Sequence, residues 1–280
     1  MPPPTETSTA PRVRCRQIAE SDLDRLAAMF MIGFPHHTRD FWDKGLAQVA
    51  ALPPVEGLAP IGYALEADGT IVGALLTISS RRGDTIISNV SAWYVEPEFR
   101  THSTLLTAMA TKHKHVTYLN TSPADHTVKT LAPLGWKPCN FGRSITVPAL
   151  SLSGGAVSRK IPADLPERKL LEDHRAWGLI SLVCKKDGQI SPFVFRRRAF
   201  TKLHLPIMEL MYCRSTADFE RCAGALGRHF LLRGALGVLL DGKVSGIVSR
   251  YMDGRDPRLY KGPRPPAPND FAYTEKVFFA

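Results

Sequence analysis

The turn at residues 96–105 holds a dense group of side chains that could bind an anion. Arg100 carries a fixed positive charge, and Thr101, Ser103 and Thr104 add hydroxyl groups beside it. The turn leads into a helix, and the first turn of a helix leaves backbone N–H groups unpaired. The aligned peptide dipoles also favour negative charge at that point. This combination of side chains and backbone predicts a site for a phosphate group.

A strand and a helix must position this turn. The apolar run Asn89–Val95 has the composition of a β-strand, and Pro97 stops it because proline has no amide hydrogen to donate. Beyond the turn, Leu105, Leu106 and Met109 recur at helical spacing. The pattern therefore predicts a strand, a polar turn and the start of a helix.

The run Val-Glu-Pro-Glu-Phe-Arg-Thr-His-Ser-Thr-Leu at 95–105 resembles the central motif of the GCN5-related N-acetyltransferases, the GNAT family. In that family, strand 4 ends in Val-x-Pro-x-x-Arg and continues as Gln/Arg-x-x-Gly-x-Gly/Ala, a loop that wraps the pyrophosphate of acetyl-CoA. Arg100 matches the first loop position, whereas Ser103 and Leu105 stand where the family has Gly and Gly/Ala. The resemblance implies acetyl-CoA as a co-substrate without a metal, bound through Tyr94, Val95, Arg100, Thr101, His102, Ser103, Thr104 and Leu105.

The resemblance also implies direct attack of an amine or hydroxyl on the thioester, whose carbonyl is polarised by a backbone N–H near Tyr94–Val95. Such a reaction needs a base for the nucleophile and an acid for the leaving thiolate. The tyrosine and asparagine common in the family are replaced here by Leu131 and Ala124. Glu96 and His126 are the candidate catalytic residues in their place. For each of them the alternative is a surface residue at the start of a helix.

The order of the expected elements supports a GNAT fold over residues 12–148, with an α/β arrangement around a mixed sheet. These elements are a strand at 13–18, a helix capped by Ser21 or Asp22, a hairpin around Asp68-Gly69, a polar turn at 80–88, the central strand, a strand at 115–120, a helix ending at Gly135 and a last strand at 141–147. The aromatic segment 34–51, which includes His36 and His37, looks like the family's segment over the acceptor side.

The rest of the chain divides into a tail, a linker and a second domain. Residues 1–11 are rich in Pro and Thr and predict a disordered tail, and residues 149–166 are rich in Ser, Gly and Pro and predict a linker. Residues 167–280 repeat the order of hairpin, strand, helix and strand. Asp187-Gly188 and Asp241-Gly242 indicate hairpin turns. We expect a degenerate GNAT-like domain that ends in a strand at 271–279.

Composition sets limits on location and partners. The net charge is +10, and residues 150–280 carry 22 Lys and Arg against 13 Asp and Glu. These charges are dispersed and no nucleic-acid motif accompanies them, so we do not expect a nucleic-acid partner. No apolar run is long enough to span a membrane. The five cysteines are scattered and odd in number, which is typical of reduced thiols in a cytoplasmic protein.

The sequence thus predicts an acyltransferase that moves an acetyl or other short acyl group from acyl-CoA to a small-molecule or peptide acceptor. A non-catalytic GNAT-fold module that binds acyl-CoA or a partner is the alternative, because the motif glycines and the tyrosine are replaced. A third and weaker hypothesis is a nucleic-acid or anionic-polymer binder that uses the basic second half. The acceptor and the oligomeric state are not encoded in any pattern of this sequence.

Overall fold

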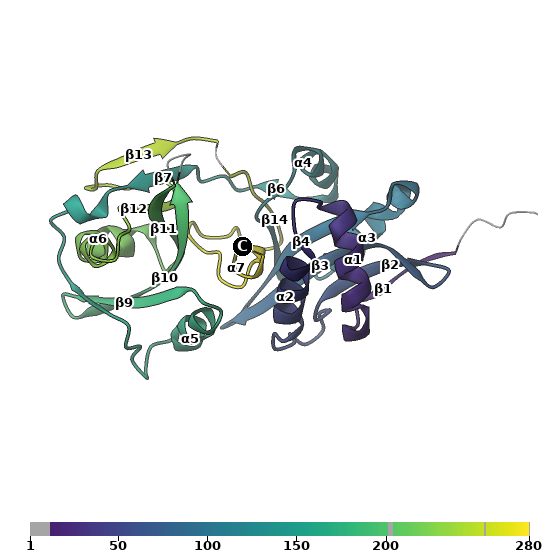
Figure 1. The fold of residues 1–280 in the computed structure, drawn as a ribbon, viewed down its shortest axis with the longest axis horizontal. Helices are drawn as coiled ribbons and strands as arrows, with labels where there is room; N and C mark the ends of the chain where they lie inside the picture. The colour runs from purple at the N-terminus through teal and green to yellow at the C-terminus, as the bar shows by residue number, and fades with distance from the viewer. Residues whose placement is uncertain (1–11, 201–203, 255, 280) are drawn as a thin grey trace, which may run out of the picture. The chain divides into compact units, whose positions relative to one another are not determined.

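The computed structural model describes residues 12–200, 204–254 and 256–279. The tail expected at 1–11 lies outside the described residues. Two seven-stranded mixed sheets with helices packed on them make up the chain, so the expected α/β fold class is confirmed (Figure 1). The described residues form two compact units, one up to Tyr118 together with Phe279, and the other Leu119–Phe278. The division at 12–148, 149–166 and 167–280 stays a prediction.

The first unit carries most of the first sheet and three helices. Its elements are β1 (Val13–Gln17), the 3-10 helix η1 (Glu20–Asp22), α1 (Leu23–Gly33), α2 (Arg39–Ala50), β2 (Gly62–Ala67), β3 (Thr70–Arg82), β4 (Thr85–Val95), the 3-10 helix η2 (Pro97–His102) and α3 (Ser103–Ala110). The strand β5 (Val116–Asn120) comes next and runs across the division. These elements follow the order that the sequence predicts.

Two hairpins form the centre of the first sheet. Asp68 and Gly69 have φ values of 47° and 86°, the left-handed conformation that a tight hairpin turn requires, and they join β2 to β3 as expected. The polar turn expected at 80–88 is wrong, because Arg82 pairs with Thr85 and only two residues lie between them. Most of this stretch belongs to the two strands, where Ser80 pairs with Ile87 and Arg81 with Ile86 across the hairpin.

The helices of the first unit bury apolar faces against the sheet and against each other. α1 packs on β3, β4 and α2, and α3 packs on β1, β2 and β3. Asp22 closes the start of the first helical segment by accepting the N–H of Ala19 at 2.9 Å. Arg16 and Arg25 also bond its carboxylate, so this cap is tied to strand and helix alike. Asp22 also stands at the N-cap position of α1, but its side chain makes no cap hydrogen bond to that helix, so the cap expected there is wrong and the bond to Ala19 at the start of η1 takes its place.

The second unit holds the second sheet. Its elements are α4 (Asp125–Leu131), η3 (Ala132–Leu134), β6 (Lys137–Pro138), β7 (Arg143–Thr146), η4 (Pro148–Leu150), β8 (Ala156–Ser158), α5 (Arg168–Ala176), β9 (Ile180–Lys186), β10 (Gln189–Phe200), β11 (Leu205–Cys213), α6 (Thr216–Leu231), β12 (Gly237–Asp241), β13 (Ser249–Met252), β14 (Leu259–Lys261) and α7 (Glu275–Phe278). Within the stretch expected to be a linker, η4 and β8 are regular elements.

The two sheets exchange strands. The first sheet has the order β1-β2-β3-β4-β5-β14-β6 and the second the order β13-β7-β12-β11-β10-β9-β8. The strand expected at 141–147 as the last one of the first sheet exists as β7, but it pairs with β12 and β13 in the second sheet. β14, from late in the chain, instead lies between β5 and β6. The first sheet is therefore completed by a segment from late in the chain, and the second sheet includes a strand from near the middle of the sequence.

Two further expectations for the second half are wrong. Asp241-Gly242 does not join two strands of a hairpin, because β12 ends at Asp241 and β13 begins at Ser249 and pairs with β7. The strand expected at 271–279 is instead a turn followed by the short helix α7. The hairpin at Asp187-Gly188 is confirmed, with φ values of 49° and 76° at its two residues.

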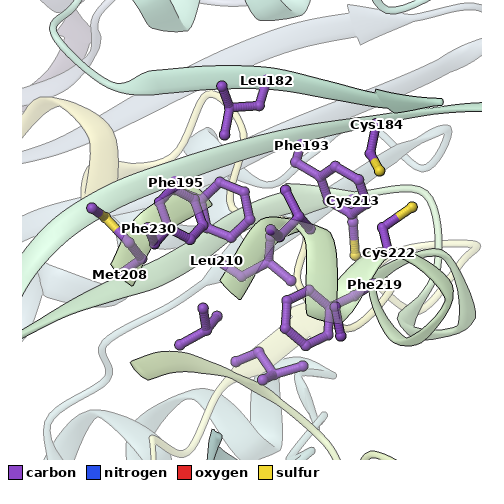
Figure 2. Close-up of a cluster of buried hydrophobic side chains, with 14 of the residues drawn as sticks. Leu182, Cys184, Phe193, Phe195, Met208, Leu210, Cys213, Phe219, Cys222 and Phe230 are labelled. Carbon is purple, nitrogen blue, oxygen red and sulfur yellow. The ribbon is translucent and has the colours of Figure 1, made fainter. Parts of the chain in front are cut away.

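The core of the second unit lies between α6 and its sheet. α6 presents an apolar face that includes Phe219, Cys222, Leu226 and Phe230. Figure 2 shows Phe219, Cys222 and Phe230 of this face against residues of β9, β10 and β11, among them Phe193 and Leu210. Ser215 begins the helix by accepting the N–H of Asp218 at 3.1 Å, so the helix is fixed at its start as well as along its face.

Candidate functional site

A β-bulge interrupts β4 three residues before the strand ends. Ala74 of β3 pairs with Tyr94 and Leu76 pairs with Ser91, so one residue of β3 faces two of β4. Ala92 sits in this bulge with φ at 46°, which is unusual for a residue other than glycine. A bulge bends its strand, leaves one residue out of the ladder and re-aims the residues beyond it. The end of β4 thus departs from regular strand geometry at the point where the predicted site begins.

The side chains of Tyr94 and Val95 are committed to packing. A Cβ atom on Gly33 would lie 2.4 Å from the Tyr94 ring, so this ring rests directly on the end of α1. Val95 is buried, and a Cβ atom on Gly73 would lie 3.0 Å from its Cγ2. These two residues can therefore offer a ligand their backbone but little of their side chains.

Glu96 lies at the junction of β4 and η2. Its N–H donates to the carbonyl of Val72 at 2.9 Å, and its own carbonyl accepts from Phe99 at 3.0 Å. The residue is half-buried, with its backbone held on both sides. Its carboxylate is thus carried by a rigid position at the end of the strand, which is what a positioned base needs.

The polar turn after β4 is more regular than the sequence predicts. η2 runs directly into α3, and the N–H of Ser103 donates to the carbonyl of Arg100. Thr101 Oγ1 lies 3.2 Å from Nδ1 of His102. Arg100, Thr101 and Thr104 are exposed, so a cation and two hydroxyl groups are available to an anion at this turn. The side chains fit a phosphate, whereas the amide of Ser103 is already in use.

Leu105 and Leu131 occupy two of the places where the resemblance implies other residues. Leu105 is 38% exposed at the start of α3, so its side chain projects where the family has Gly or Ala. Leu131 is buried in α4, which makes the place of the usual tyrosine a core position. Packing in the core therefore explains the leucine at position 131. The side chain of Leu105 lies beside the predicted phosphate site.

His126 lies on α4, next to the exposed Asp125. The side chain of His126 lies outside the described residues. Glu96 belongs to the first unit and His126 to the second. The catalytic roles of Glu96 and His126 stay predictions, as do the cofactor contacts of the turn.

An aromatic cluster surrounds Trp42 in the first unit. The centroid of its ring lies 4.8 Å from that of Phe30, 5.4 Å from that of Phe34 and 5.5 Å from that of Phe279. His37 stacks on the ring of Phe41 at 4.0 Å. The sequence points to the aromatic residues of this segment but not to Phe279, because no local pattern links a residue at the chain end to α2.

A buried ionic cluster in the second unit has no counterpart in the sequence prediction. Arg143 donates to Glu209 at 2.7 Å, and Arg258 donates two hydrogen bonds to Asp241. All four side chains are buried. Burial opposes the ionisation of Glu209, but Arg143 and Arg196 together hold its pKa well below the usual range. Each of these residues looks like a surface charge in the sequence, so only the fold brings them together.

The described residues contain neither a metal-binding group nor a membrane-crossing helix. No set of three or more His, Cys, Asp or Glu side chains in the described ranges could hold a metal ion. No helix in the described part of the chain is both long and apolar enough to cross a membrane.

Comparison with solved structures settles the fold. A GCN5-related N-acetyltransferase from Anabaena variabilis matches 89% of this chain and 72% of its own, with a TM-score of 0.60 and 10% identity. The chain has the GCN5-related N-acetyltransferase fold. A GNAT protein from Kribbella flavida matches 89% of this chain and 71% of its own, with a TM-score of 0.56 and 14% identity.

A third structure widens the set of GNAT-fold neighbours. It is the GCN5-related glucosamine N-acetyltransferase region of a fungal multi-domain β-N-acetylglucosaminidase, which matches 90% of this chain and 38% of its own, with a TM-score of 0.57 and 13% identity. No family model matches the sequence, and no curated protein matches it either. The neighbours thus show a GNAT fold for this chain. Its β4, η2 and α3 are the strand, turn and helix that the sequence predicts around Arg100.

Proposed function

We propose that the protein is an acyltransferase that moves an acetyl or other short acyl group from acyl-CoA to an amine or hydroxyl acceptor. The observation that carries this proposal is the end of β4, where a bulge at Ala92 precedes a turn with the exposed cation of Arg100. The fold supports it, because its structural neighbours include N-acetyltransferases. The acceptor is a small molecule or a peptide.

The exposed side chains of the turn support the roles that we propose for them. Arg100 would pair with the pyrophosphate of CoA, and the hydroxyl groups of Thr101 and Thr104 would donate hydrogen bonds to it. A backbone N–H at the bulged end of β4 would donate to the thioester oxygen, where negative charge develops. Ser103 and Leu105 would border the pyrophosphate with side chains instead of glycine backbone.

The reaction needs one proton removed and one supplied. The nitrogen or oxygen of the acceptor attacks the carbonyl carbon, the carbon–sulfur bond breaks, and the CoA thiolate takes a proton. Glu96 and His126 are the candidates for base and acid, and Glu96 has the better-defined place at the end of β4. We place this activity in the cytoplasm, which the five free cysteines support.

The alternative function is an acyl-CoA-binding or partner-binding module without turnover. Two observations favour it. The N–H of Ser103 already donates to the carbonyl of Arg100, and the side chain of Leu105 lies beside the turn. Measuring the free CoA released from acetyl-CoA in the presence of a panel of amines distinguishes the enzyme from the binding module. Release that requires both an acceptor and Glu96, tested with Glu96→Gln, supports the enzyme. Saturable binding of acetyl-CoA without any release supports the module.

A gain-of-function variant sharpens this test. If Leu105 crowds the pyrophosphate, Leu105→Ala should bind acetyl-CoA more tightly than the wild type. Leu152, which is fully exposed in the second unit, provides the matched control Leu152→Ala. Equal affinity in all three proteins would mean that Leu105 does not border the ligand.

A further inference from the structure

Two cysteines of the second unit face each other at one end of its core. Cys184 lies on β9 and Cys222 on α6, and neither is exposed. Both belong to the same buried cluster, and each thiol shifts the pKa of the other. Figure 2 shows both sulfur atoms at the same end of the buried cluster, one from the sheet and one from the helix. The pair thus joins two elements that are far apart in the sequence.

Only a thin layer of backbone covers Cys184. A Cβ atom on Gly155 would lie 2.8 Å from the Cys184 sulfur, so the chain just before β8 passes directly over it. β8 is a strand of three residues at the edge of the second sheet, and its Val157 pairs with Cys184. A short edge strand next to two glycines opens more easily than the interior of a sheet. We therefore expect a small molecule to reach this end of the core by local opening of β8, without global unfolding.

Cys222 borders a polar group at the margin of the apolar core. Arg221 donates to Ser191 Oγ at 2.6 Å, and Ser191 donates to Asp218 at 3.1 Å. Nε of Arg221 is buried and has no hydrogen-bond partner among the described residues. The neighbouring Cys184 thiol, together with the charge of Arg221, lowers the pKa of Cys222 although burial opposes this. Cys222 and burial in turn raise the pKa of Cys184, which stays a thiol.

Cys213 shows what the same core does to a cysteine without these neighbours. It is 1% exposed on β11 and belongs to the same buried cluster. Burial and the carboxylates of Asp218 and Asp270 raise its pKa, so it stays a thiol at neutral pH. Cys213 is therefore an internal control for a buried cysteine without a second thiol beside it.

We propose that Cys184 and Cys222 form a dithiol that responds to peroxide by closing into a disulfide between β9 and α6. The Cys222 thiolate attacks one oxygen of hydrogen peroxide, the O–O bond breaks, and a sulfenic acid and one water form once the released hydroxide takes a proton. The Cys184 sulfur then attacks the Cys222 sulfur, the S–O bond breaks, and the proton of Cys184 leaves with the second water. Two thiols and one peroxide thus give one disulfide and two waters.

Peptide mapping of the full-length protein tests this pair directly. The native protein is treated with hydrogen peroxide, its remaining thiols are alkylated, and trypsin separates the cysteines into peptides 176–185, 203–214 and 222–228. We expect a linked pair of 176–185 and 222–228, which a dithiol reductant reverses. We also expect Cys222 to be lost at least about tenfold faster than Cys213, because thiolates and not thiols react with peroxide.

A variant isolates the second step. In Cys184→Ser the sulfenic acid of Cys222 has no partner, so a dione reagent specific for sulfenic acids should label Cys222 in the variant and not in the wild type. If this variant does not fold, the mapping of the wild type decides alone. The proposal is overturned if Cys222 stays reduced, if Cys213 is oxidised as fast, or if the linked peptides form only in urea.

Discussion

Arg143 of β7 and Glu209 of β11 form a buried ion pair, with 2.7 Å between Nη2 and Oε1, across a strand that lies between them. That strand is β12, and its Asp241 is the residue paired with Arg143 in the sheet. Three adjacent strands of the second sheet are therefore joined by side-chain charges as well as by backbone hydrogen bonds. β7 comes from near the middle of the sequence, so this cluster also secures a strand that is far from its partners in the chain.

Removing one partner of this cluster should be costly. Arg143→Met leaves the carboxylates of Glu209 and Asp241 buried with fewer partners, and we expect a loss of about 3–5 kcal/mol in the free energy of unfolding. The control is Arg168→Ala, which removes an exposed pair with Glu172 on α5 and should cost less than about 0.5 kcal/mol. Urea denaturation measures both. Equal losses in the free energy of unfolding would show that the buried cluster stabilises the fold no more than the exposed pair does.

The cap at Asp22 should make stability depend on acid. Hydrogen bonds from Arg16, then from Ala19 and Arg25, lower the pKa of Asp22 from 3.8 to about 2 although burial opposes this. A carboxyl group with a lowered pKa stabilises the fold above its ordinary pKa, and this contribution is lost as the pH falls from about 4 to 2. Urea denaturation at pH 5 and pH 2.5 should show a smaller acid-dependent loss for Asp22→Asn than for the wild type. The same loss in both proteins would mean that other carboxylates account for it.

Gly45 should be essential for the position of Phe279. A Cβ atom at residue 45 would lie 2.2 Å from the Phe279 ring, so Gly45→Ala should cost about 1–3 kcal/mol by overpacking. In the background of Phe279→Ala the clash is gone, and the same change should gain up to about 1 kcal/mol because alanine favours a helix. A double-mutant cycle measured by urea denaturation gives the coupling. If the two substitutions have additive effects on the free energy of unfolding, Phe279 does not contact residue 45 in solution.

Residues 12–148 should not fold into a complete domain when they are expressed alone. In the full chain β6 pairs with β14, and β7 pairs with β12 and β13, so this fragment lacks the partners of both strands. We expect weak near-ultraviolet circular dichroism and a broad urea transition for the fragment, compared with the full chain. A sharp, cooperative transition would instead support the division at the expected linker.

The first half of the fold could be predicted because its signals are local. Asp68-Gly69 adopts the left-handed turn that this dipeptide favours, and the apolar spacing of the helices matches their buried faces. Asp241-Gly242 carries the same turn signal, yet the carboxylate of Asp241 is buried and bound by Arg258 and the N–H of Asn269. A distant pairing thus overrides a local preference that the sequence displays plainly.

The site could be predicted only as far as its element order. The strand, turn and helix around Arg100 are present, but the 3-10 helix η2, which uses the amide of Ser103, has no clear sequence signal. The bulge at Ala92 has none either, since alanine is not a residue that usually adopts positive φ. The placement of β7 in the second sheet and of β14 in the first could not be predicted for a further reason. Each strand has a sequence pattern that either sheet would accept.

Binding of acetyl-CoA at the turn after β4 is the central claim, and thermal unfolding with and without this ligand tests it most directly. Ligand at about a hundred times its dissociation constant should add roughly 2.7 kcal/mol of stability to the wild type. Arg100→Ala should lose most of this shift, whereas Arg81→Ala, which removes an exposed charge at the far end of the β3–β4 hairpin, should keep it. No shift at millimolar acetyl-CoA, or equal shifts in both variants, would contradict the claim.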